Sequence, residues 1–139
     1  LSSTRIKKIY KIISFLLKIR NYKKRFYKFP NPHIRTTGFL INSHDFLLFM
    51  KNNSPITKED AWSLESGKNS LTNFFKRKNY NIFIVNSEGK KFSEENWAHS
   101  ETYNYLSQSK SIISDKHTRK YNSLDQIQKK IYQLRTWGI

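Results

Sequence analysis

The sequence predicts a small α+β domain in which two short β-hairpins lie between a basic amphipathic N-terminal helix and a C-terminal helix. Three observations predict this class. Apolar residues recur at helical spacing at both ends of the chain, short apolar runs separated by turn residues occupy the middle, and regular strand-helix-strand alternation is missing. A chain of 139 residues is long enough for one domain with its own apolar core.

The N-terminal helix is predicted over residues 5–20. One face carries the apolar residues Ile6, Ile9, Tyr10, Ile13, Leu16 and Leu17. The opposite face carries Lys7, Lys8, Lys11, Ser14 and Lys18. Three interpretations fit: a helix that packs its apolar face on the core, an extension whose Lys7, Lys8, Lys11, Lys18 and Arg20 bind nucleic-acid phosphates, or a membrane-surface or targeting helix. Because lysines and Arg20 interrupt the apolar residues, we expect no membrane-spanning segment.

A basic and aromatic run follows the helix and ends at Pro30 and Pro32. Its cations, which suit phosphate groups, are Lys23, Lys24, Arg25 and Lys28. Tyr22 and Tyr27 offer flat rings on which unpaired bases can stack. The competing interpretation is that the aromatic rings of this run fill the core and only the lysines face solvent.

The middle of the chain predicts two hairpins and three helices. The first hairpin pairs residues 36–41 with 46–50 through a turn at 42–45, and the second pairs 81–85 with 90–92. A helix is predicted from Thr57 through residue 64, where Asp60 completes a capping box, and another over 70–78. A third helix is predicted from Ser93 towards Leu106.

The C-terminal part predicts a polar loop over residues 108–122, followed by a helix that Ser123 and Gln126 begin as a capping box. The loop carries a second basic group, Lys116, Arg119 and Lys120, which we expect to contact phosphates. The chain is thus divided into a basic helical extension (1–32), a neutral α+β body (33–107) and a basic loop with the C-terminal helix (108–139).

Charge indicates the kind of partner. The formal net charge is +16, and residues 1–44 carry eleven Lys and Arg but no Asp or Glu. Residues 45–101 carry eight bases and eight acids, and residues 102–139 carry seven bases and two acids. A neutral body with basic ends is typical of a protein that binds a polyanion.

Composition indicates the origin of the gene. Phe, Tyr, Met, Ile, Asn and Lys, whose codons are rich in A and T, make up 66 of the 139 residues. Organellar genomes are biased in this way. We therefore expect the protein in the mitochondrial matrix.

Catalytic signatures are missing from the sequence. The chain has no cysteine, its four histidines do not have metal-ligand spacing, and its four glycines form no phosphate-binding loop. We therefore expect no metal, no cofactor and no small-molecule substrate. His99, with acids nearby, and His117 are the only candidates for acid-base chemistry.

These observations predict a non-catalytic, structural rRNA-binding subunit of a mitochondrial ribosome, whose partners are rRNA and neighbouring subunits. One alternative is an accessory subunit of a mitochondrial respiratory-chain complex, with its helix on an anionic membrane surface. A second alternative is a basic ribonuclease toxin domain that uses His99 or His117 as its base.

Overall fold

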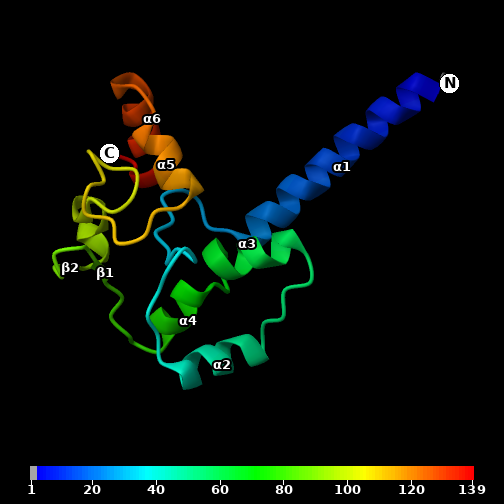
Figure 1. Cartoon of the computed structure of the whole chain (residues 1–139). Helices are drawn as coiled ribbons and strands as arrows, with labels where there is room; N and C mark the ends of the chain where they lie inside the picture. The colour runs from blue at the N-terminus through cyan, green and yellow to red at the C-terminus, as the bar shows by residue number, and fades with distance from the viewer. Residues whose placement is uncertain (1–2) are drawn as a thin grey trace.

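The computed structural model describes residues 3–139, and side chains are described from Lys7 on, so that of Ile6 lies outside the described part. The described chain is mostly helical and contains one small antiparallel sheet (Figure 1). The elements in chain order are α1 (Ser3–Arg25), α2 (Ser43–Lys51), α3 (Lys58–Ser66), α4 (Leu71–Arg77), β1 (Ile84–Val85), β2 (Lys91–Phe92), the 3₁₀ helix η1 (Glu94–Ser100), α5 (Lys116–Asn122) and α6 (Gln126–Trp137).

The first predicted hairpin is wrong. Residues 36–41 form no strand, and residues 46–50 belong to helix α2. The reason is Asn42, whose side chain accepts hydrogen bonds from the backbone N–H groups of His44 (2.9 Å) and Asp45 (3.4 Å). A polar run that resembles a turn is therefore the N-cap of a helix, and Phe46, Phe49 and Met50 follow at helical spacing.

The next two predicted helices are confirmed. Thr57 and Asp60 form the expected capping box at the start of α3, and Gly67 lies at its C-terminal end. Ser70 caps α4, which buries Leu71 and Phe75. Here the cap residues and the spacing of the apolar side chains agree, so local sequence determines both helices.

The second predicted hairpin is also confirmed, but its strands are shorter than the predicted ranges 81–85 and 90–92. β1 and β2 pair antiparallel, with Ile84 opposite Phe92 and Val85 opposite Lys91. The helix expected after Ser93 forms only as η1 and stops at Ser100, because Glu101 takes a left-handed conformation with φ of 54°.

The polar loop predicted over residues 108–122 is wrong in its second half, which forms α5. Asp115 caps this helix and exchanges hydrogen bonds with Thr118 in a capping box. The C-terminal helix is confirmed as α6, but Asp125 caps it instead of the predicted Ser123. In both cases an aspartate before the helix supplies the acceptor for the free N–H groups.

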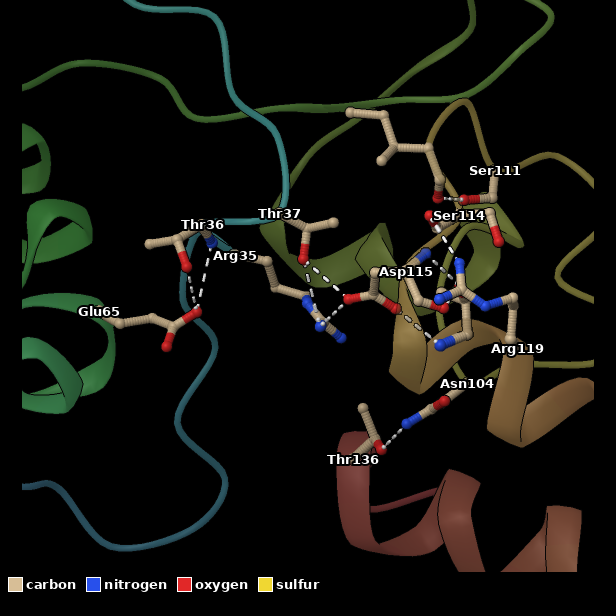
Figure 2. Close-up of polar contacts among 12 residues, drawn as sticks. Arg35, Thr36, Thr37, Glu65, Asn104, Ser111, Ser114, Asp115, Arg119 and Thr136 are labelled. Carbon is tan, nitrogen blue, oxygen red and sulfur yellow. Dashed lines mark hydrogen bonds and ion pairs between the residues drawn. The ribbon is translucent and has the colours of Figure 1, made fainter. Parts of the chain in front are cut away.

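Segment 35–37 contacts both α3 and the start of α5. Arg35 and Thr37 both donate hydrogen bonds to Oδ2 of Asp115, each at 3.1 Å, and the Arg35 guanidinium lies 3.4 Å from the centre of the Tyr103 ring. Figure 2 shows Arg35 and Thr37 converging on Asp115 at the start of α5, while Thr36 turns the other way towards Glu65 of α3. This segment therefore fixes α3 and α5 relative to each other.

The apolar core is small for the length of the chain. Phe49, Leu71 and Phe75 form one buried cluster between α2 and α4, and Phe92, Trp97 and Tyr121 are buried elsewhere. The accessible surface is 10726 Å². A compact monomer of 16.7 kDa exposes roughly 7,600 Å². The chain is thus much more open than an isolated globular domain.

Candidate nucleic-acid interface

Helix α1 projects from the body, and its N-terminal half stands clear of every other element (Figure 1). It positions most of the predicted phosphate ligands on exposed helix surface: Lys7, Lys8, Lys11, Lys18, Arg20, Lys23 and Lys24. Lys28 follows the helix and is exposed as well. Within the described part of the chain, none of these eight residues forms an ion pair. Their charges are therefore available to an external polyanion.

The interpretation that α1 packs its apolar face on the core is wrong. Ile9, Ile13, Leu16 and Leu17 are all more than half exposed. The main cluster of buried apolar residues lies between α2 and α4, and the described part of the apolar face of α1 does not contact it. Helical periodicity predicts which residues share a face, but it does not predict what covers that face.

Tyr22 and Tyr27, the predicted stacking residues, lie at the base of α1. Tyr22 is 60% exposed and Tyr27 is 50% exposed. Tyr22 stacks on Phe26, with ring centres 4.5 Å apart and planes inclined by 19°. Phe26 itself is half-buried and forms a β-bridge with Gly67. Both interpretations of the aromatic run thus apply in part, since Phe26 packs inwards and the two tyrosines face solvent.

Arg25, also predicted to bind phosphate, is already occupied by a protein partner. Its guanidinium forms an ion pair with Asp60 of α3. The hydrogen bond from Arg25, together with those from Thr57, holds the pKa of Asp60 well below its usual range. The backbone oxygen of Arg25 accepts a 2.8 Å hydrogen bond from the N–H of Lys68. Arg25 thus anchors the base of α1 on α3.

Gly67 makes this anchor possible. A Cβ at this position would lie 2.4 Å from the backbone oxygen of Ser63 and 3.0 Å from that of Arg25, both closer than ordinary contacts. Only glycine allows the chain after α3 to pass so near to α1.

Lys68 is a further cation at the base of α1 that sequence reasoning missed. Its Nζ donates a 3.2 Å hydrogen bond to the backbone oxygen of Lys23 and lies 5.7 Å from the centre of the Tyr27 ring. A single lysine in the charge-neutral middle of the chain gives no signal in the sequence. Only the fold brings it beside Lys24 and Tyr27.

A polar hollow of about 350 Å³ lies beside this base. Lys24, Arg25 and Lys68 supply its cations, and its one acid, Asp60, is paired with Arg25. The amide side chains in its wall are Asn52, Asn53 and Asn69. Its size and its donors suit a phosphate group, and the exposed ring of Tyr27 lies near Lys68 for a base, whereas Tyr22 lines a different hollow.

The second basic group lies apart from the first. Lys116, Arg119 and Lys120 are exposed on the short helix α5. Figure 1 separates α5 and α6 clearly from the projecting half of α1. The structure therefore presents two basic surfaces on one molecule, and a polyanion must extend across the body to reach both.

The predicted acid-base pair at His99 does not form. His99 is exposed, and its ring packs against the edge of Tyr105, with ring centres 5.8 Å apart. The three nearby acids have other partners in the described structure, since Glu94 pairs with Lys76, Glu95 accepts a hydrogen bond from Ser93, and Glu101 lies 4.0 Å from Lys110. His117 is exposed at the start of α5.

No cluster of three or more His, Cys, Asp and Glu residues with metal-binding geometry occurs among residues 3–139. No helix in the same part of the chain is both long enough and apolar enough to cross a membrane. Comparison with protein-family models, curated proteins and solved structures finds no match to this chain.

Proposed function

We propose that this protein is a non-catalytic, structural rRNA-binding subunit of a mitochondrial ribosome. The observation that carries the proposal is the set of eight exposed cations on and after α1, within a stretch of 44 residues that contains no acid. The cations on an acid-free surface of this kind repel one another, and binding to phosphates relieves that repulsion.

The base of α1 supplies a specific way to hold single-stranded RNA. Lys24 and Lys68 face the polar hollow, where a backbone phosphate fits, and Lys23 and Lys28 flank it along the chain. Tyr27 then offers an exposed ring to the adjacent base, and Tyr22 offers a second exposed ring further along the strand. Phosphate contacts provide most of the affinity, and stacking favours unpaired over duplex RNA.

The open shape of the molecule supports the role of a subunit. Its accessible surface exceeds that of a compact monomer of the same mass by roughly 3,000 Å². A protein–protein interface of standard size buries about 800 Å² on each partner, so the excess accessible surface corresponds to several such interfaces. In this proposal residues 1–32 and 108–139 contact rRNA, and residues 33–107 pack on neighbouring proteins.

Ultraviolet crosslinking in cells tests the proposal. The tagged chain is crosslinked, purified under denaturing conditions, and the attached RNA is sequenced. We expect mitochondrial rRNA as the main product, with crosslinks at Tyr22 and Tyr27. A chain that crosslinks to no RNA, or that cleaves RNA in a reaction abolished by His99→Ala or His117→Ala, contradicts the proposal.

A further inference from the structure

The projecting half of α1 exposes an apolar surface that RNA binding does not explain. Seven large apolar side chains between residues 9 and 17 are exposed by 52% to 75%: Ile9, Tyr10, Ile12, Ile13, Phe15, Leu16 and Leu17. Such a dense exposed patch marks an interaction surface. We call this patch the apolar arc of α1.

The apolar arc is wide and is bordered by lysines. At 100° per residue, the side chains from Phe15 round to Tyr10 span roughly 220° of the helix circumference. The remaining sector carries Lys7, Lys11 and Lys18 together with Ser14, and Lys8 falls just inside the edge of the arc beside Phe15. The polar sector of residues 7–18 therefore contains cations and a hydroxyl but no acid.

The chemistry of this surface selects among possible occupants. RNA offers phosphates, hydroxyls and base edges, which do not bury the side chains of Ile and Leu. A helix that packs in a protein groove buries an apolar stripe of about 100° of its circumference, so much of this arc would stay in water. A second copy of α1 brings a further acid-free set of lysines, which repel each other.

A bilayer surface that contains anionic lipid satisfies both parts of the helix. The acyl boundary accepts a wide apolar arc, and the phosphate groups of the lipids pair with the lysines at its border. Tyr10 and Phe15 are of the aromatic type that suits the interface between acyl chains and headgroups. Charge complementarity therefore favours an anionic over a zwitterionic surface.

We propose that residues 7–18 of α1 lie flat on an anionic lipid bilayer, with the apolar arc in the acyl boundary and Lys7, Lys11 and Lys18 among the headgroups. These residues span about 17 Å along the helix axis. Arg20, Lys23 and Lys24 follow on the same side of α1 as the apolar arc, so beyond the C-terminal end of the arc they meet the lipid headgroups. In this arrangement Lys7, Lys11 and Lys18 contact lipid phosphates in place of rRNA, and the basic surface on α5 remains available to RNA. The protein would thus attach an RNA-containing particle to a membrane surface, which goes beyond the proposed rRNA-binding role.

Vesicle flotation with the full chain tests this proposal. The probes are vesicles of phosphatidylcholine alone and of phosphatidylcholine mixed with phosphatidylglycerol. We expect binding to the mixed vesicles only. The double variant Ile13→Asn/Leu17→Asn should weaken it by about tenfold or more, because each substitution removes an apolar side chain from the buried arc. The triple variant Lys7→Gln/Lys11→Gln/Lys18→Gln should weaken it on the order of 100-fold, since each lysine near an anionic surface contributes about fivefold.

Matched controls separate this surface from general hydrophobicity. Ile127→Asn/Ile131→Asn removes two exposed apolar side chains from α6 and should leave vesicle binding unchanged. Equal binding to both kinds of vesicle, binding to neither, or equal losses in the control and the α1 variant would overturn the proposal.

RNA binding measured on the same proteins separates this proposal from the rRNA-binding role. Ile13→Asn/Leu17→Asn should retain its affinity for RNA. If it loses RNA affinity while vesicle binding is unchanged, the apolar arc belongs to the ribonucleoprotein interface and the lipid proposal is wrong. If the wild-type chain binds anionic vesicles but no RNA, the lipid proposal stands and the rRNA-binding role falls.

Discussion

The salt dependence of RNA binding reports how many phosphates the base of α1 contacts. The perturbation is the triple variant Lys23→Gln/Lys24→Gln/Lys28→Gln. All three side chains are exposed and form no ion pair with the described residues, so their substitution should leave the fold intact. Arg25 is left in place because its pairing with Asp60 holds the helix on the body.

The expected magnitude follows from counter-ion release. Each phosphate contact on single-stranded RNA contributes about 0.7 to the slope of log affinity against log salt, so the triple variant should lose about 2 from that slope. The ratio of wild-type to variant affinity should then grow roughly 20-fold when salt falls from about 200 mM to about 50 mM. Fluorescence anisotropy with a labelled single-stranded RNA, measured across this salt range, provides both slopes.

The control removes the same number of charges from the neutral body. Lys51→Gln/Lys58→Gln/Lys91→Gln changes three exposed lysines that lie outside both basic ends of the chain. We expect its slope to match that of the wild type. Equal slopes for all three proteins, or the same loss in the control as in the α1 variant, would refute the placement of the RNA at the base of α1.

Three further predictions concern the fold. Phe75→Ala should lower the free energy of unfolding by about 3–5 kcal/mol, because Phe75 is buried in the α2–α4 cluster. Urea denaturation measures this loss, and a loss below about 1 kcal/mol would mean that this cluster does not hold the fold. Asp115→Ala should destabilise the protein more than Asp125→Ala does. Both variants lose a helix N-cap worth about 1–2 kcal/mol, but only Asp115 also pairs with Arg35. Equal melting temperatures of the two variants would contradict this role of the Arg35 contact. Acid should destabilise the protein as pH falls below about 4, because hydrogen bonds from Lys78 and Tyr80 lower the pKa of Asp45 in the folded state and its stabilising contribution is lost as the carboxyl is protonated. Asp45→Asn should flatten this dependence in thermal melts taken at a series of pH values.

Local signals in the sequence predict the elements whose caps and apolar spacing agree. Thr57 with Asp60 and the run that follows Ser70 identify α3 and α4, and the turn at residues 86–89 identifies the β1–β2 hairpin. These elements depend on hydrogen bonds between residues a few positions apart. Their boundaries can therefore be read without knowledge of the tertiary structure.

Prediction fails where one residue type serves two kinds of local structure. Asn42 favours a turn and a helix N-cap equally, and the helical spacing of Phe46, Phe49 and Met50 decides between them. Asp115 is similar, because a helix of seven residues within a polar segment gives too short a pattern to recognise.

The candidate site was predictable in composition but not in arrangement. The acid-free stretch identifies Lys23, Lys24 and Lys28 as free cations, and the structure leaves all three exposed. The pairing of Arg25 with Asp60 and the approach of Lys68 to Tyr27 join residues more than thirty positions apart. Contacts at that separation depend on how α3 packs against the base of α1, which periodicity does not encode.

Density-gradient sedimentation of mitochondrial lysate tests the rRNA-binding role most directly. The tagged chain should migrate with ribosomal particles at low salt and leave them at high salt, because its contacts are mainly with phosphates. The triple variant Lys23→Gln/Lys24→Gln/Lys28→Gln should dissociate at lower salt than the wild type. A chain that instead migrates with detergent-solubilised respiratory complexes, and is absent from rRNA-containing fractions at every salt concentration, would contradict this account.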